Sequence, residues 1–293
     1  MSLKIFLDGK MVDKEEAKIS VFDHGLLYGD GVFEGIRAYN GRIFRLKEHI
    51  DRLFEGIHTI CLKLQQTKEE MAQIVVDTCR VNNLADGYIR LVVTRGVGNL
   101  GLDPYSCQKP SIFCIANKIT LYPDEYYQNG LTLATVPTRR NINEACNVRV
   151  KSLNYLNNIY AKIEANLLNV PEVIFLNNDG YVAEASADNI FYAKDGILYT
   201  PPLYACNLGG ITRSVVMELA VKLGIEVKEM LFTRYDMYNA DECFVTGTAA
   251  ELVPAVVYDG RTIGQGKPGP IYKSILAAFK ELTKTEGVPI FNN

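Results

Sequence analysis

A lysine at the junction of two local patterns is the first residue of this chain that could do chemistry. Lys151 follows an apolar strand-like segment at residues 148–150 and precedes a helical pattern, so the stem of its side chain can be buried. Burial lowers the pKa of a lysine and makes it a nucleophile. Tyr155 lies one helical turn further on, where it can share the same environment. Exposed lysines are far more common than catalytic ones, so this position alone is weak evidence.

Two glycine-containing turns are candidate anion-binding sites. In residues 208–213 (LGGITR) a glycine turn runs into an amphipathic helix, whose first backbone N–H groups suit a phosphate. Residues 245–251 (VTGTAAE) repeat the arrangement, because a strand ends at Gly247 and Thr248 offers a hydroxyl and an amide. Either turn alone is explained by an ordinary helix cap. The two together favour a phosphorylated ligand.

A carboxylate in an apolar segment completes the set. Glu184 lies among small and apolar neighbours in residues 180–191 (GYVAEASADNIF), where a strand is expected. A carboxylate in such a place usually has a charged or hydrogen-bonded partner. A buried lysine, two phosphate turns and a lone carboxylate are the parts that a pyridoxal phosphate enzyme needs. The lysine forms the Schiff base, the turns hold the phosphate, and the carboxylate keeps the ring nitrogen protonated.

The elements that must position these residues form a mixed pattern of helices and strands. Apolar spacing predicts helices at 46–64, after the capping box at Thr67, and at 153–168, 211–223 and about 271–282. A hairpin is expected at 4–12, and strands are expected at 88–94, 111–118, 131–136 and 173–176. After the turn at 177–180 a strand is expected to run through Tyr192, followed by short strands near Val227, Phe244 and Val256. The polar segment 121–130 is expected to be a linker. We therefore expect an α+β fold with a small N-terminal α/β domain at 1–120 and a larger C-terminal domain at 131–293.

Composition excludes several classes of protein. The net charge of −3 over 293 residues does not fit broad nucleic-acid binding, and no apolar run approaches the roughly 18 residues of a membrane span. The first twelve residues carry charges that do not fit a signal peptide. Seven scattered cysteines without a C-x-x-C pair indicate a reducing compartment, and three histidines leave few metal ligands. We expect a cytoplasmic protein with no metal site, no membrane partner and no nucleic-acid partner.

A glycine pattern in this chain imitates a dinucleotide-binding motif. Gly96, Gly98 and Gly101 have the G-x-G-x-x-G spacing after an expected strand. That motif requires a helix to begin at its third glycine. Pro104 and Pro110 follow within a few residues and prevent such a helix. The segment is therefore expected to be a flexible loop.

Seven ordered blocks reveal a resemblance that covers nearly the whole chain. They are residues 27–37 (LYGDGVFEGIR), 49–53 (HIDRL), 88–90 (YIR), 151–158 (KSLNYLNN), 208–213 (LGGITR), 247–251 (GTAAE) and 259–270 (DGRTIGQGKPGP). With these blocks the chain resembles the fold-type IV pyridoxal phosphate aminotransferases, and most of all the branched-chain amino acid aminotransferases. The resemblance implies the two-domain fold of D-amino acid aminotransferase, with a pseudo-barrel as the larger domain.

The resemblance also implies a reaction and its partners. The expected reaction is ping-pong transfer of the amino group between L-leucine, L-isoleucine or L-valine and 2-oxoglutarate, so the partners are amino acids and 2-oxo acids. The expected assembly is a homodimer or a larger homo-oligomer, in which Leu100 and Leu102 would cover the substrate pocket of the neighbouring subunit.

Residue roles follow from the same resemblance. Lys151 would form the Schiff base with pyridoxal 5'-phosphate and carry the proton. The cofactor-binding residues would be Arg52, Ile211, Thr212 and Thr248 at the phosphate, Tyr155 at the phenolic oxygen, Glu184 at the ring nitrogen and Leu208 on the ring face. The substrate-binding residues would be Thr248 and Ala249 at the α-carboxylate, and Phe33, Arg37, Tyr88 and Arg90 around the side chain. From its helical pattern alone, Arg52 would be an exposed charge.

Two departures and three alternatives remain. Ala185 stands where the family often has glycine, and Gly209 stands where it often has proline. A D-amino acid aminotransferase would carry an arginine and a histidine after the 88–95 strand, and this chain has neither there. An aminodeoxychorismate lyase generally lacks the 88–90 and 259–270 blocks. A non-catalytic relative would be expected to lose Lys151 or Glu184.

Overall fold

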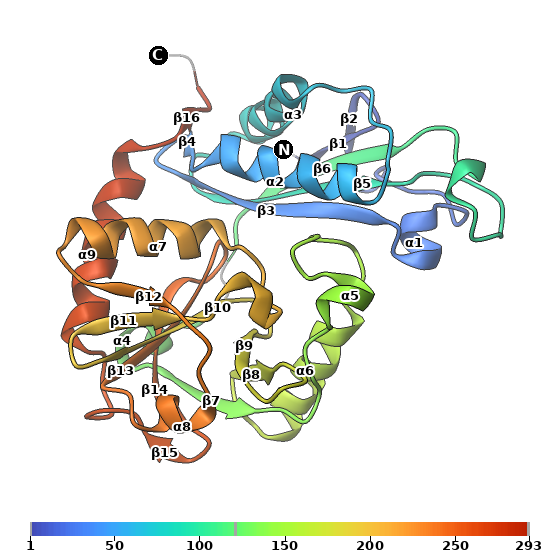
Figure 1. Ribbon diagram of the computed structural model, residues 1–293. Coiled ribbons are helices and arrows are strands. Elements are labelled where there is room, and N and C mark those ends of the chain that lie inside the picture. Colours follow the sequence, from blue (N-terminus) through green and yellow to red (C-terminus); the bar gives the residue numbers. More distant parts are fainter. Residues whose placement is uncertain (1, 120–121, 292–293) are drawn as a thin grey trace. The chain divides into compact units, whose positions relative to one another are not determined.

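The computed structural model describes residues 2–119 and 122–291, which group into two compact units (Figure 1). Unit 1 contains residues 2–119, 150–154 and 283–291, and unit 2 contains residues 122–149 and 155–282. The expected domain boundary at residues 120 and 121 lies outside the described residues, so the bounds 1–120 and 131–293 stay a prediction. Within the expected linker, Asp124–Asn129 form the short helix α4.

Unit 1 is built on an antiparallel sheet whose described strands run in the order β16-β4-β3-β5-β6-β1-β2. The strands are β1 (Lys4–Leu7), β2 (Lys10–Asp13), β3 (Gly31–Tyr39), β4 (Arg42–Ile43), β5 (Gly87–Thr94), β6 (Ser111–Asn117) and β16 (Val288–Pro289). The helices are α1 (His24–Tyr28), α2 (Leu46–Thr59) and α3 (Lys68–Val81). The expected hairpin and the two expected strands of this region are confirmed.

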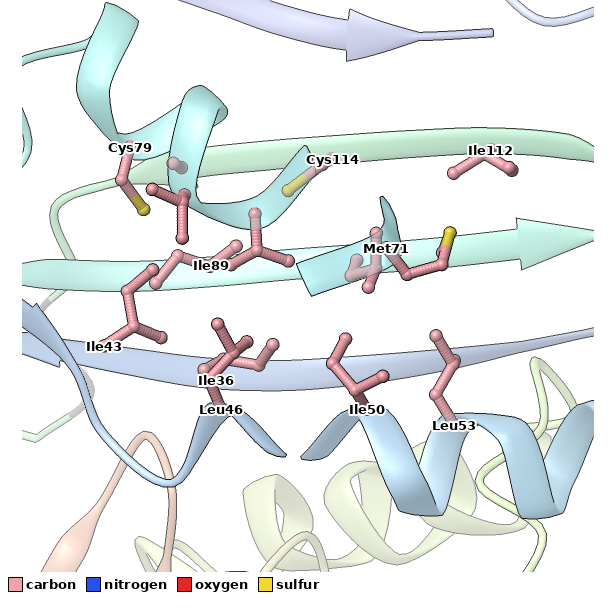
Figure 2. Packing of buried hydrophobic residues seen from close by; sticks show 14 of the residues in the cluster. Ile36, Ile43, Leu46, Ile50, Leu53, Met71, Cys79, Ile89, Ile112 and Cys114 are labelled. Atoms are coloured by element: carbon pink, nitrogen blue, oxygen red, sulfur yellow. The ribbon is translucent and has the colours of Figure 1, made fainter. Parts of the chain in front are cut away.

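Helices α2 and α3 are held by their apolar faces. Leu46, Ile50 and Leu53 of α2 pack with residues of α3 and of the sheet in one buried cluster (Figure 2). The capping box of α3 is confirmed, because the Thr67 side chain accepts from the Glu70 backbone and the Glu70 carboxylate accepts from the Thr67 backbone. The prediction that α2 continues to residue 64 is wrong. The helix ends at Thr59, and Cys61 adopts a left-handed backbone that cannot continue it.

Unit 2 contains a mixed sheet whose described strands run β12-β11-β10-β13-β14-β7-β8-β9, with β15 paired to β14. The strands are β7 (Leu131–Thr135), β8 (Glu172–Leu176), β9 (Val182–Ala185), β10 (Asn189–Lys194), β11 (Ile197–Thr200), β12 (Val227–Glu229), β13 (Glu242–Gly247), β14 (Glu251–Tyr258) and β15 (Arg261–Thr262). The helices are α4, α5 (Asn143–Cys146), α6 (Leu156–Leu167), α7 (Ile211–Lys222), α8 (Arg234–Tyr238) and α9 (Pro270–Thr285).

The expected α+β class is confirmed, with two local corrections in the elements that carry candidate residues. The strand expected to run through Tyr192 is interrupted, because β9 ends at Ala185 and β10 begins at Asn189. The helix expected from residue 153 begins at Leu156, because residues 150–154 instead run beside β3. Both departures depend on partners that are distant in the sequence.

The glycine loop at residues 96–101 contains no helix, so the rejection of a dinucleotide-binding motif is confirmed. Pro104–Ser106 form only one turn of 3-10 helix. Leu100 and Leu102 are 69% and 79% exposed on this loop. No helix in the described part of the chain has the length and apolar character needed to cross a bilayer.

Candidate active site

The candidate residues divide between the two units. Unit 1 contains Phe33, Arg37, Arg52, Tyr88, Arg90 and Lys151, and unit 2 contains Tyr155, Glu184, Leu208, Ile211, Thr212, Thr248 and Ala249. Each unit therefore holds its own part of the chemistry, and the local geometry of each part is described in turn.

Lys151 is held against strand β3 by backbone hydrogen bonds. The Phe33 amide donates to the Lys151 carbonyl at 2.9 Å, and the Leu153 amide donates to the Gly31 carbonyl at 3.0 Å. The Lys151 ammonium lies 4.6 Å from the centroid of the Phe33 ring. The lysine therefore lies in a segment that is hydrogen-bonded to a regular strand, with an aromatic surface beside its amine.

The expected side-chain pocket residues share one face of the unit 1 sheet. Arg37 pairs with Tyr88 and Gly35 pairs with Arg90 in the β3–β5 register, and Phe33 precedes Gly35 by two residues. A side chain at Gly35 would have no room, because its Cβ atom would lie 2.0 Å from the Tyr88 hydroxyl oxygen. Glycine at this position lets the tyrosine lie across the strand.

Arg90 contacts the two aromatic side chains of this face. Its guanidinium carbon lies 4.5 Å from the Phe33 ring centroid and 5.5 Å from the Tyr88 centroid, and its Nη2 donates to the Tyr88 hydroxyl at 3.0 Å. The Arg90 Nε is buried without a hydrogen-bond partner in the structure. A ligand acceptor would satisfy that donor, so the face suits an anionic group beside an apolar one.

Arg52 is not an exposed charge of α2, as its helical pattern alone would suggest. Its side chain is 11% exposed and forms a bidentate ion pair with Glu34 of β3, in which Nε donates to Oε1 and Nη2 donates to Oε2, each at 2.7 Å. The Nδ1 of His49 lies 2.8 Å from the same Oε2. We call these three residues, Glu34, His49 and Arg52, the Glu34 cluster.

Electrostatics keep Glu34 charged and His49 neutral. Burial by itself raises the pKa of Glu34, but the charge and hydrogen bonds of Arg52 and the hydrogen bond from His49 outweigh it and lower the pKa to about 2. Burial lowers the pKa of His49 below its usual 6.5, although its hydrogen bond with Glu34 acts in the opposite direction. Neutral His49 therefore donates its Nδ1–H to a carboxylate that Arg52 already neutralises.

Glu34 and His49 were missed by reasoning from the sequence. The signal for Glu34 was present, because it is a carboxylate in the middle of the apolar strand pattern at 31–36, as Glu184 is in its own segment. His49 lies three residues before Arg52 on α2 and so shares its side of the helix.

Glu184 is buried with a charged partner, as expected for a carboxylate in an apolar strand. The Nε of Arg140 donates to Glu184 Oε1 at 2.8 Å, and both side chains are 6% exposed. The Leu208 amide donates to Oε2 at 2.8 Å, and the Asn189 amide group lies 3.4 Å from the same oxygen. We call the four residues Glu184, Arg140, Asn189 and Leu208 the Glu184 cluster.

Arg140 is a second residue that the sequence did not reveal. Its Nη1 donates to the side-chain oxygens of Asn157 at 2.7 Å and of Asn158 at 3.3 Å, and its guanidinium carbon lies 5.1 Å from the Phe175 ring centroid. The guanidinium group thus connects β9 to the first turn of α6, which begins directly after Tyr155. Nothing in the spacing around residue 140 indicates this role.

The two candidate anion turns lie against the same short segment. A Cβ atom at Gly210 would lie 2.0 Å from the Asn189 side-chain oxygen, and one at Gly247 would lie 2.0 Å from an Asp188 carboxylate oxygen. Asn189 also donates to the Leu208 carbonyl at 2.8 Å. The structure therefore brings both turns and Glu184 together around residues 188–189.

The turn before α7 has the features of an anion site. Gly210 is the N-cap of this helix and provides no side-chain cap for the first N–H groups, at Ile211 and Thr212. Thr212 is 5% exposed. On the second turn, Thr248 and Ala249 lie between the paired strands β13 and β14. Both turns thus lie against residues 188–189, and the roles of their individual residues stay predictions.

Comparisons with known proteins assign these features to a family. Residues 31–258 match the family model of the class IV aminotransferases. The chain is 53% identical to a putative branched-chain-amino-acid aminotransferase of Methanocaldococcus jannaschii, over 99% of this chain and 100% of that one. It is 37% identical to a D-alanine aminotransferase of Staphylococcus haemolyticus, over 95% of this chain and 97% of the relative.

Solved structures agree with this assignment. The branched-chain amino acid aminotransferase of Escherichia coli superposes with a TM-score of 0.94 at 35% identity, covering 98% of this chain and 97% of that one. The branched-chain amino acid aminotransferase of Thermobaculum terrenum, in its PLP-form, has a TM-score of 0.89 at 29% identity, covering 97% of this chain and 94% of that one.

Proposed function

Because this chain belongs to the class IV aminotransferases, we propose that it transfers the amino group between L-leucine, L-isoleucine or L-valine and 2-oxoglutarate, with pyridoxal 5'-phosphate as its cofactor. The likeness to branched-chain amino acid aminotransferases over nearly the whole chain supports this choice of substrates. The observation that carries the proposal is the group of side chains around Phe33. An amine, an aromatic surface and a guanidinium lie together there.

The residues present fit the cofactor. The uncapped N-terminus of α7 and the turn at Thr248 offer N–H and hydroxyl donors to a phosphate, and Arg52 offers a guanidinium whose orientation is fixed by Glu34. Glu184, paired with Arg140, offers an acceptor to a protonated ring nitrogen. When bound, the cofactor supplies an electron sink for the pair of electrons released as the Cα–H bond of the amino acid breaks.

In this proposal Lys151 is the catalytic residue. Its amine would hold the cofactor and, once released from it, would carry the proton from Cα of the amino acid to C4′ of the cofactor; the half-reaction with the 2-oxo acid would run the same transfer in reverse. The remaining cofactor contacts are assigned to Arg52, Ile211, Thr212 and Thr248 at the phosphate, Tyr155 at the phenolic oxygen, Glu184 at the ring nitrogen and Leu208 on the ring face.

The substrate contacts explain how one site can accept two kinds of side chain. Phe33 and Tyr88 offer aromatic surfaces to a branched aliphatic group, whereas Arg90, with Arg37 two strand positions away, offers a cation to the distal carboxylate of glutamate. The amides of Thr248 and Ala249 are assigned to the α-carboxylate of either substrate.

The proposal includes a cytoplasmic homodimer. Three side chains of the glycine loop and its continuation, Leu100, Leu102 and Tyr105, are 69%, 79% and 78% exposed. Large apolar side chains gathered on one loop support contact with another protein surface, here a second copy of this chain. All seven cysteines are free thiols, which supports a reducing compartment.

Reductive trapping tests the catalytic assignment. The purified protein is incubated with pyridoxal 5'-phosphate, reduced with borohydride, digested and examined by mass spectrometry. We expect the label on Lys151, its loss in Lys151→Ala, and its retention in Lys14→Ala, which removes an exposed lysine of the same unit. A label on another lysine in the wild type would contradict the assignment.

A substrate panel tests the reaction itself. L-leucine with 2-oxoglutarate, D-alanine with 2-oxoglutarate, and aminodeoxychorismate are offered in parallel to the wild type and to Lys151→Ala. We expect turnover of L-leucine by the wild type alone. Turnover of D-alanine only would favour the activity named for the Staphylococcus haemolyticus relative, and turnover of aminodeoxychorismate only would favour a lyase.

A further inference from the structure

A pocket in unit 2 is lined by three arginines and by none of the residues assigned above to cofactor or substrate. It has a volume of about 470 Å³, and its lining residues come from the ends of β7 and β8 and from α8 and β15. Figure 1 labels these four elements. Arg139 follows β7, Arg234 is the first residue of α8, and Arg261 is the first residue of β15. Three separate segments of the chain therefore bring guanidinium groups to one hollow.

The carboxylate in the lining, that of Asp259, is already engaged by neutral donors. Its Oδ1 accepts from the Thr135 amide at 2.6 Å, and its Oδ2 accepts from the Thr135 hydroxyl and the Tyr238 hydroxyl, each at 2.8 Å. Asp259 therefore connects β7 to α8 by hydrogen bonds to Thr135 and Tyr238. Across the described residues, none of the three arginines forms an ion pair with an acid.

One of these arginines packs on a tyrosine of the lining. The Arg261 guanidinium carbon lies 4.3 Å from the Tyr238 ring centroid, and its Nη1 donates to the Asp259 carbonyl at 3.0 Å. Burial and the Asp259 carboxylate raise the pKa of Tyr238, and the charges of Arg234 and Arg261 act in the opposite direction.

Arginines in this arrangement repel one another, and a hollow concentrates their field. Guanidinium groups bind carboxylate and phosphate oxygens through paired, charge-assisted hydrogen bonds. The volume falls in the range of small-molecule sites, roughly 300–1,000 Å³. We propose that this pocket binds a small dianion, such as a phosphate monoester or a dicarboxylate, among Arg139, Arg234 and Arg261.

Calorimetric titration tests the proposal on the purified protein with saturating pyridoxal 5'-phosphate, so that the proposed cofactor site is filled. Inorganic phosphate and succinate are titrated separately at low ionic strength. We expect saturable binding of at least one of them, and a dissociation constant raised by at least about tenfold in Arg234→Ala/Arg261→Ala, because charge-assisted hydrogen bonds are lost. If phosphate binds more tightly, the ligand class is a phosphate monoester; if succinate binds more tightly, it is a dicarboxylate.

A matched control removes the same amount of charge from the same unit. Lys222→Ala/Lys273→Ala changes two exposed lysines of α7 and α9 and should leave the dissociation constant unchanged. Arg139→Ala, a second and independent variant, should weaken binding in the same direction as the arginine pair. Circular dichroism establishes that each variant is folded. The absence of saturable binding, equal affinity in the arginine variants, or equal weakening in the lysine control would each overturn the proposal.

Discussion

Each unit of this molecule holds a buried carboxylate paired with an arginine, but the two pairs are built differently. In the Glu34 cluster the pair is bidentate and joins two regular elements, β3 and α2. In the Glu184 cluster one arginine nitrogen meets the carboxylate, and the other contacts are made by the Leu208 amide and by Asn189. Arg140 shares its remaining donors with Asn157 and Asn158.

The difference indicates what each carboxylate does. Glu34 neutralises and orients one cation, so its main effect is on the position of Arg52 and on the stability of unit 1. Glu184 is held by groups that also fix the turn before α7 and the first turn of α6. Its surroundings therefore keep a charged acceptor in place beside the candidate phosphate turn. We expect substitutions in the first cluster to act mainly on stability, and substitutions in the second to act mainly on catalysis.

Removal of the Glu34 carboxylate should have the largest effect. Glu34→Ala leaves the Arg52 guanidinium, 11% exposed, without its acid partner, and the free energy of unfolding should fall by about 3–5 kcal/mol. Glu184→Ala should cost less, because Arg140 keeps its hydrogen bonds to Asn157 and Asn158. Urea unfolding followed by circular dichroism measures both. A larger fall in the free energy of unfolding for Glu184→Ala than for Glu34→Ala would contradict the proposed difference between the two clusters.

Conservative amides separate stability from catalysis. Glu184→Gln keeps the shape of the side chain and an acceptor for the Leu208 amide, but it removes the negative charge, and kcat for L-leucine should fall by about 100-fold. Its urea midpoint should move less than that of Glu34→Gln, which leaves a bidentate guanidinium facing a neutral group.

The two variants Glu34→Gln and Glu184→Gln can also contradict the proposed difference between the clusters. Equal losses of kcat in Glu34→Gln and Glu184→Gln, at equal cofactor occupancy, would mean that the two clusters do not differ in function. Occupancy is measured from the absorbance of the bound cofactor.

The Glu34 cluster should also give the protein an acid-sensitive stability. The pKa of His49 is lowered in the folded state, so as the pH falls through 6.5 the unfolded chain binds more protons at this residue than the folded chain does, and stability falls. His49→Gln should flatten this dependence by up to about 1.4 kcal/mol per pH unit. Urea unfolding at several pH values measures the slope. A slope equal to that of the wild type would contradict the neutral state of His49.

Glu34 extends the same trend to lower pH. Its pKa is about 2 in the folded state against an ordinary value of 4.5, so its stabilisation is complete above about pH 4.5 and is lost as the pH falls toward 2. The total amounts to about 3 kcal/mol. In Glu34→Gln the part of the pH dependence below 4.5 should therefore become smaller.

Local patterns predicted the regular elements of both units. The apolar spacing of α2, the capping box at Thr67 and the glycine turn before α7 depend on neighbours within a few residues, and each appears in the structure. The burial of Glu184 could be predicted as well, because its neighbours in the sequence are small and apolar. The same reasoning applied to Glu34 would have predicted that it is buried with a charged partner, without identifying Arg52.

The remaining features depend on contacts between distant parts of the chain. Arg140 is 44 residues from Glu184, and Lys151 pairs with a strand more than a hundred residues earlier. The interruption at residues 186–188 has a similar cause, because the Ser186 amide donates to the distant Glu172 and its carbonyl accepts from Asn158. Spacing in the sequence carries no signal for such partners.

The smallest effect is expected from the residue next to Arg52. Asp51 accepts hydrogen bonds from Lys47 and Lys68, each at 2.6 Å, but its side chain is 31% exposed and that of Lys47 is 84% exposed. Solvent and salt screen such pairs, so Asp51→Asn should leave the urea midpoint unchanged within error at physiological salt. A loss comparable to that of Glu34→Ala would mean that burial does not decide which ion pair of α2 matters. Asp51 and Arg52 are consecutive residues of one helix. We therefore attribute the expected difference in stability between removing the ion pairs of Asp51 and removing the ion pair of Arg52 to the side of the helix on which each residue lies.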